Sequence, residues 1–280
     1  MAGSHLIYHL RKNVATTVAT GLILVLIVIA IIGPYVVPYD PLATAMDKVL
    51  SPPSADNWFG TDNLGRDIFS RVIVATRLDF AIALAAVGIS AFVGITVGAT
   101  AGYVGGLFDS IFSRVVDVMM AFPLFVAAMA LVAVFGNSVQ SIVLATAIIN
   151  FPFYFRLARI EAASRREVGY VEAAIINGNS STSVIMRFLL PNSLPPVIVQ
   201  ISLNLGWAIL NTSGLAFIGL GVAPPTPEWG IMIQEGSALM LSGQWWVVTF
   251  PGLALVLSVF CFSLVGDGLR EVLDPRRRSR

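Results

Sequence analysis

The chain has 280 residues, of which 56% are hydrophobic and only 12% are charged, and its formal net charge is +1. Because soluble domains carry about 25% charged residues, this composition excludes an ordinary soluble globular protein. The near-neutral charge gives no indication of a nucleic-acid partner, and the one cysteine, Cys261, cannot form a disulfide within the chain.

Six continuous apolar runs predict membrane-spanning helices, since a helix needs about 20 mostly apolar residues to cross a bilayer. The first run is too long for the apolar core of a signal peptide and leads into Pro38, so we expect it to remain as a span. In chain order the runs cover residues 14–37, 80–103, 115–135, 139–155, 195–220 and 247–265. The predicted fold class is therefore an all-α membrane protein with six transmembrane helices.

The distribution of positive charge predicts that both ends of the chain lie in the cytoplasm. With the N-terminus placed inside, only four of the 17 lysines and arginines fall in outer segments, namely Lys48, Arg66, Arg71 and Arg77. Cytoplasmic segments of membrane proteins are enriched in these residues, so the opposite orientation is disfavoured.

These spans divide the chain into segments. We expect a cytoplasmic tail over residues 1–13, a first transmembrane helix over 14–38, an extracytoplasmic segment over 39–78, a five-helix core over 79–270 and a basic tail over 271–280. Within the core, the large connections are a cytoplasmic loop over 157–194 and an outer loop over 221–246.

Small residues and aromatic residues mark further features. Gly94, Gly98 and Gly102 share one face of the second span and predict a close helix–helix contact, although the sequence does not identify the partner helix. After the turn at residues 64–65, an apolar face predicts a helix lying in the outer interface. The tryptophans at 229, 245 and 246 are typical of an aromatic belt.

Several kinds of functional site are absent from the sequence. Neither lysine follows a glycine, so the chain lacks the phosphate-binding loop of an ATPase. The apolar runs are nearly free of ionisable residues, which disfavours a proton- or sodium-coupled carrier. The only histidines, His5 and His9, lie in the N-terminal tail, which disfavours a metal site or an intramembrane enzyme. We therefore expect a non-catalytic chain with no catalytic, cofactor-binding or metal-binding residues of its own.

The cytoplasmic loop over 157–194 predicts a bent pair of helices. Apolar residues at three- and four-residue steps, among them Val171 and Ile175, predict an amphipathic helix that continues from the preceding span. Gly178 predicts its end, because glycine adopts the left-handed conformation without penalty. Asn179 or Ser180 then caps a second short helix, which we expect to end at Pro191. Periodicity alone leaves two roles open, an interfacial anchor or a rigid knob for a partner.

The residues of this loop resemble the EAA loop of bacterial ABC importer permeases. Glu172-Ala173-Ala174, then Gly178, then Leu190-Pro191 keep the spacing of that motif, with Phe188 where isoleucine is usual. The resemblance implies that this segment is the coupling helix that docks into a groove on an ATPase subunit. It assigns ATPase coupling to Glu172, Ala173, Ala174, Gly178, Leu190 and Pro191.

Three further stretches, residues 57–71, 221–230 and 266–275, resemble the C-type permease of the dipeptide/oligopeptide/nickel ABC importer family. The resemblance implies a type I ABC importer permease fold in the bacterial inner membrane. It also implies a homologous B-type permease, two ATPase subunits that bind ATP and Mg, and an extracytoplasmic substrate-binding protein as partners.

The function implied by this resemblance is uptake of di- or oligopeptides by alternating access. Two alternatives stay open at this point: a permease for nickel or a metallophore, and a standalone channel or secondary carrier. The outer segments either cap the bundle or also receive the binding protein.

Overall fold

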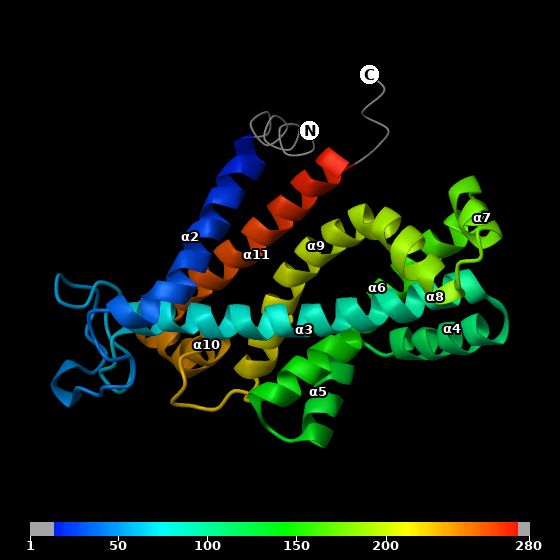
Figure 1. Ribbon diagram of the computed structural model, residues 1–280. Coiled ribbons are helices and arrows are strands. Elements are labelled where there is room, and N and C mark those ends of the chain that lie inside the picture. Colours follow the sequence, from blue (N-terminus) through cyan, green and yellow to red (C-terminus); the bar gives the residue numbers. More distant parts are fainter. Residues whose placement is uncertain (1–13, 274–280) are drawn as a thin grey trace.

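A computed structural model describes residues 14–273 (Figure 1). Residues 1–13 and all but the first residues of the predicted basic tail lie outside the described residues. The prediction of an all-α protein is confirmed for the described part, where the only β pairing is an isolated bridge between Thr61 and Asp67. The helices are α2 (Val14–Val36), α3 (Ile68–Val104), α4 (Gly106–Ala121), α5 (Leu124–Phe135), α6 (Val139–Arg165), α7 (Gly169–Ile176), α8 (Ser181–Val184), α9 (Leu190–Phe217), α10 (Trp229–Ser237) and α11 (Trp246–Leu273).

Five helical segments are long and apolar enough to cross a membrane: α2, α3, α6, the continuous helix over 181–217, and α11. The sixth candidate is the pair α4 and α5, which bends by 99° between the two helices and passes the same test when they are taken together as one broken span. The prediction of six spans is therefore confirmed with one of them broken.

The break between α4 and α5 replaces the straight helix expected over residues 115–135. Pro123 lacks a backbone N–H and disfavours the helical conformation of the residue before it. Phe122 accordingly adopts an extended conformation, with φ −86° and ψ 141°. Helix α4 also begins earlier than expected, at Gly106.

The glycine face of α3 packs against α6, which identifies the partner that the sequence left open. A Cβ on Gly94 would lie 2.6 Å from the Cβ of Tyr154, and one on Gly98 or Gly102 would collide with the backbone of Phe155 or Arg159. Real Cβ atoms do not approach so closely, so only glycine lets the two backbones meet. Helices α3 and α6 consequently form the most extensive contact in the molecule, and they lie side by side in Figure 1.

Residues 68–78, which we expected to form an interfacial helix, are the first turns of α3. The helix begins after Asp67, whose side chain accepts a hydrogen bond of 2.8 Å from the backbone N–H of Ser70. Arg71, on the polar side of that helix opposite its apolar face, is 1% exposed. Arg71 is buried because a cluster of acidic side chains from other segments covers it, whereas Arg77 stays exposed.

That cluster joins the outer segment to α10. Arg66 contacts Asp62 at 2.6 Å and Glu235 at 2.9 Å, and Arg71 lies 3.6 Å from the same two carboxylates. Two cations and two anions balance one another, so the group can be buried without a net charge. The outer segment is thus fixed onto the bundle as a cap.

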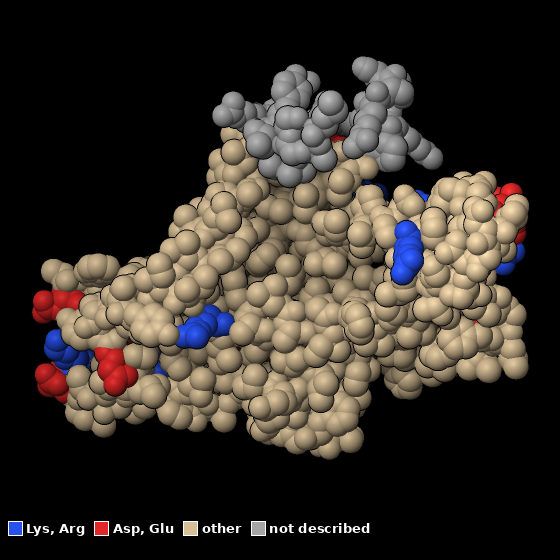
Figure 2. Space-filling view, viewed as in Figure 1, with Lys and Arg blue, Asp and Glu red and all other residues tan. Residues whose placement is uncertain are grey.

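The tryptophans expected in an aromatic belt divide into two kinds. Trp229 and Trp246 are buried, and their ring N–H groups donate to the carbonyls of Val72 and Thr61, both at 3.2 Å. Trp245 is half exposed, as a belt residue would be. Trp229 therefore anchors α10 to α3, and Trp246 anchors α11 to the outer segment. Figure 2 shows that charged side chains gather at the two ends of the molecule, with a nearly uncharged surface between them.

Candidate functional site

The predicted coupling segment forms a bent structure that we call the elbow, residues 166–191 (Figure 1). It contains a turn after α6, then α7, a second turn at Gly178, α8, and one turn of π-helix over Ile185–Leu189 that leads into α9. The amphipathic helix that we expected to run through residues 157–175 is thus split, because α6 ends at Arg165 and α7 begins anew at Gly169.

Helix α7 ends at the predicted glycine. Gly178 has φ +79°, its N–H donates to the carbonyl of Ile175 at 2.9 Å, and the N–H of Asn179 donates to the carbonyl of Ala174 at 3.2 Å. This pair of bonds is the Schellman arrangement, in which a left-handed residue closes the last turn of a helix. A Cβ on Gly178 would meet nothing within 4 Å, so the need for glycine is conformational and not steric.

Side chains hold the turn on both sides. The Asn177 amide donates to the carbonyl of Ala173 at 2.8 Å, and the Ser183 hydroxyl donates to the Asn179 side-chain oxygen at 3.1 Å. Ser180 caps α8 by accepting a hydrogen bond from the Ser183 N–H at 3.4 Å. The turn is therefore a defined corner and not a loose connection.

Pro191 does not end the second helix, contrary to our expectation. The N–H of Leu190 donates to the carbonyl of Ile185, five residues back, which is the π-helical spacing. The wider turn places Pro191 in the first turn of α9, where proline is tolerated. Force applied to α8 would therefore pass directly into the α9 span.

The inner side of the elbow is packed against the ends of two spans. Its buried side chains share an apolar cluster with Ala99 of α3 and with Ala158 and Ala162 of α6. The elbow contributes Val171, Ala174, Val184, Ile185 and Leu189 to this cluster. Small alanines on the span side allow close approach, so the elbow is fixed to α3 and α6 as one body.

The outer side of the elbow is apolar and uncovered. Ile176 is 85% exposed, and Ile175, Tyr170, Val168 and Met186 are also exposed. We had placed Ile175 on the buried face. The new start of α7 at Gly169 rotates the buried face to Val171 and Ala174, so the two isoleucines turn outward.

The six residues that the motif assigned to coupling differ in their exposure to solvent. Glu172, Ala173, Gly178 and Pro191 lie at the surface, whereas Ala174 is buried and Leu190 is half-buried. The exposed apolar side chains Tyr170, Ile176 and Met186 were not among the predicted site residues. In the sequence, only their spacing from Gly169 marks these side chains. That spacing becomes informative only once the start of α7 is known.

Ion pairs connect α4 to α6 near the elbow. Arg156 and Asp117 lie 2.6 Å apart, and Arg159 contacts both carboxylate oxygens of Asp109. The described part of the chain contains no group of three or more histidine, cysteine, aspartate or glutamate side chains suited to a metal ion. Apolar side chains and charged groups are thus what the outer side of the elbow offers.

Two family models match the chain. One describes a binding-protein-dependent transport system inner membrane component and matches residues 94–279. The other describes the N-terminal transmembrane domain of oligopeptide transport permease C and matches residues 5–53.

Similar proteins cover nearly the whole chain. A probable D,D-dipeptide transport system permease protein of Escherichia coli is 42% identical over 98% of this chain and 92% of its own. A dipeptide transport system permease protein of Alkalihalophilus pseudofirmus is 41% identical over 96% and 88%. A glutathione transport system permease protein of Pectobacterium atrosepticum is 39% identical over 96% and 89%.

Among solved structures, a chain of the inward-facing MetNI methionine ABC transporter matches with a TM-score of 0.57 and 16% identity. The match covers 73% of this chain and 96% of that one. At this identity the match concerns the fold alone, and that fold is the one that the sequence predicted.

Proposed function

The chain belongs to the family of binding-protein-dependent transport system inner membrane components, and from this we propose that it is the permease subunit of an importer for di- or oligopeptides. The relatives named for dipeptide transport support a peptide cargo. The family implies an ATPase and a substrate-binding protein as partners. We further propose a homologous B-type permease beside this chain and two ATPase subunits, which would bind ATP and Mg, on the cytoplasmic side.

The observation that carries this proposal is the contrast between the two sides of the elbow. Its inner side is fixed to α3 and α6, and its outer side exposes apolar side chains around Ile176. Fully burying one such side chain is worth roughly 1.5–3 kcal/mol. A partner groove that covers Tyr170, Ile176 and Met186 would therefore bind the elbow firmly, with Glu172 at the rim.

The mechanism that follows is a rigid-body transmission. When ATP closes the ATPase dimer, its grooves move together, and each groove carries an elbow with it. Because the elbow continues into α9 through the π turn and packs on α3 and α6, its displacement would reorient three spans at once. Alternating access requires that docking favours one state of the permease over the other.

Two substitutions on the outer side test this role. Ile176→Asp places a charge where the groove would bury an isoleucine, and Glu172→Lys reverses the charge at the rim. Both should reduce co-purification of the ATPase subunits with the permease. Leu241→Asp is the matched control, since Leu241 is 97% exposed at the opposite end of the molecule. Unchanged co-purification of the ATPase with both elbow variants would remove the elbow from that interface.

A further inference from the structure

The break between α4 and α5 lies within the span and not at its end. At one end of the pair, Asp109 of α4 contacts Arg159 near the end of α6. At the other end, the Asn137 amide after α5 donates to the carbonyl of Gly219, just after α9, at 3.3 Å. The bend at Phe122 separates 16 residues of α4 from 12 of α5, so in a broken span it lies between the two membrane faces.

The residues at this break are exposed. Ala121, Phe122 and Pro123 all lie at the surface, and Phe122 is 60% exposed. Carbonyls in the last turn of a helix have no intrahelical donor, and Pro123 has no N–H to give. Non-helical backbone at membrane depth persists only where protein covers it or where it lines a water-filled cavity. The break therefore faces something that can donate hydrogen bonds.

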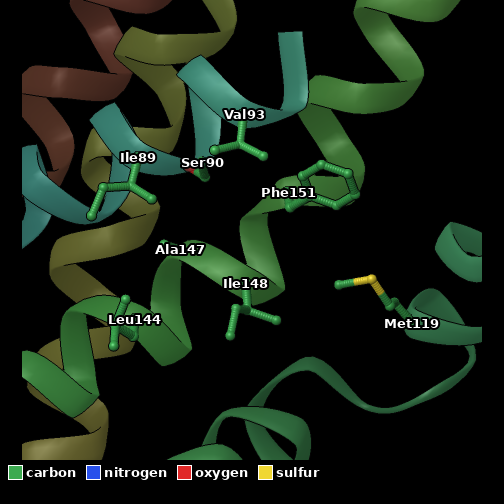
Figure 3. Close-up of a pocket in the computed structure, with 8 residues that line it drawn as sticks. All are labelled: Ile89, Ser90, Val93, Met119, Leu144, Ala147, Ile148 and Phe151. Carbon is green, nitrogen blue, oxygen red and sulfur yellow. The ribbon is translucent and has the colours of Figure 1, made fainter. Parts of the chain in front are cut away.

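An apolar pocket opens next to the break (Figure 3). Its volume is about 230 Å³, and Met119, three residues before Phe122, faces Ile148 and Phe151 of α6 across the opening. Ile89 and Val93 of α3 and Leu144 of α6 complete most of the lining. The one hydroxyl in the lining, on Ser90, already donates to the carbonyl of Val87 at 3.1 Å. An apolar cavity of about 150 Å³ is enough to hold a benzene ring.

We propose that the pocket and the adjacent helix break form a subsite on the transport path for a peptide that carries an apolar side chain. The side chain enters the pocket, and the carbonyls at the end of α4 accept hydrogen bonds from the peptide N–H groups or its terminal ammonium. The negative end of the α4 dipole favours the ammonium. This inference rests on the proposed function, to which it adds the class of substrate that this chain itself contacts.

The carbonyls at the end of α4, which lack intrahelical donors, distinguish the peptide from other occupants. A lipid acyl chain fits the apolar pocket but has no hydrogen-bond donor for the break. A helix of a second permease subunit also fits poorly, because its own N–H groups are used within the helix. A short extended peptide supplies both an apolar side chain and free N–H groups, so it matches both parts of the subsite.

The test compares two dipeptides in proteoliposomes that contain the whole importer with its binding protein. Val93→Phe fills the pocket from a half-exposed position, and Met119→Ala widens it. We expect Val93→Phe to lower uptake of Ala-Phe relative to Ala-Ala by about tenfold, as a loss of 1.4 kcal/mol would. Met119→Ala should raise the same ratio. Val256→Phe, the same exchange on the exposed face of α11, should leave it unchanged.

Two readouts distinguish a failure of the subsite from a failure of the proposed function. If the wild-type importer takes up neither these dipeptides nor longer peptides, the proposed function fails and the subsite with it. If the wild type takes up both dipeptides and the Ala-Phe to Ala-Ala ratio is the same in all variants, the subsite alone is overturned. A photoreactive residue at position 148 should capture peptide during turnover. Capture of phospholipid or of the second permease in its place overturns the subsite.

Discussion

Substitution of Gly178 isolates the contribution of the elbow, because the cost is confined to one backbone torsion. An L-residue at φ +79° is disfavoured by roughly 1–2 kcal/mol, and asparagine is disfavoured less than other residues. For a β-branched residue this conformation is an outlier, and no neighbour lies close enough to add a steric clash. We therefore expect valine to weaken the corner most, by about 2 kcal/mol, which is close to a 30-fold shift in the population of the formed turn.

The assay is binding-protein-stimulated ATPase activity and peptide uptake by the reconstituted importer, measured for Gly178→Asn, Gly178→Ala and Gly178→Val. Both rates should fall together in that order, while the two permeases still co-purify. The two rates should fall together because a relaxed turn at Gly178 loses the hydrogen bonds that end α7. A displacement of α7 is then no longer transmitted to α9. Wild-type uptake by the valine variant, or an asparagine variant as poor as valine, would refute the reasoning.

Three other changes test the fold. Gly98→Ala forces a Cβ against the α6 backbone and should lower the thermal stability of the purified complex by about 1–3 kcal/mol, whereas Gly88→Ala, with open space around it, should not. Arg66→Ala leaves Asp62 and the partly buried Glu235 with Arg71, 3.6 Å away, as their remaining cation, and should cost less than the roughly 3–5 kcal/mol of a fully unpaired buried charge in the same unfolding measurement. Burial raises the pKa of the Glu228 carboxyl. Between the ordinary and the raised pKa, the folded state therefore holds a proton that the unfolded state has released. Thermal stability should therefore fall as pH rises from the ordinary glutamate range through the raised pKa, and Glu228→Gln should flatten that profile.

The spans could be predicted because membrane insertion is decided by local composition. A run of apolar residues has the same meaning in any fold, and the spacing of Gly94, Gly98 and Gly102 likewise indicates a close contact whatever its partner. That the partner is α6 depends on the arrangement of all the spans, which no local pattern encodes.

The errors share one physical cause, which is that distant residues decide what a local pattern buries. The sequence predicts an exposed charge at Arg71, but Glu235, far along the chain, pairs with it in the fold. Ile175 reads as a buried position until α7 starts again at Gly169. Pro191 reads as a helix end until a π turn shifts it into the first turn of α9. In each case the residue type was interpreted correctly and its surroundings were not.

The elbow and the proposed subsite lie on the same pair of helices, which has a mechanical consequence. Ala158 packs beneath the elbow, and Phe151, seven residues earlier on α6, lines the pocket, a distance of about 10 Å along the axis. Between them, Gly98 of α3 meets the α6 backbone directly, so no side chain is available to rotate and absorb a displacement. A movement imposed on the elbow would therefore reach the α3 and α6 walls of the pocket through direct backbone contact. The Phe122 break adjoins Met119 in the pocket's third wall, so closure of the proposed subsite would bring α3 and α6 against the end of α4.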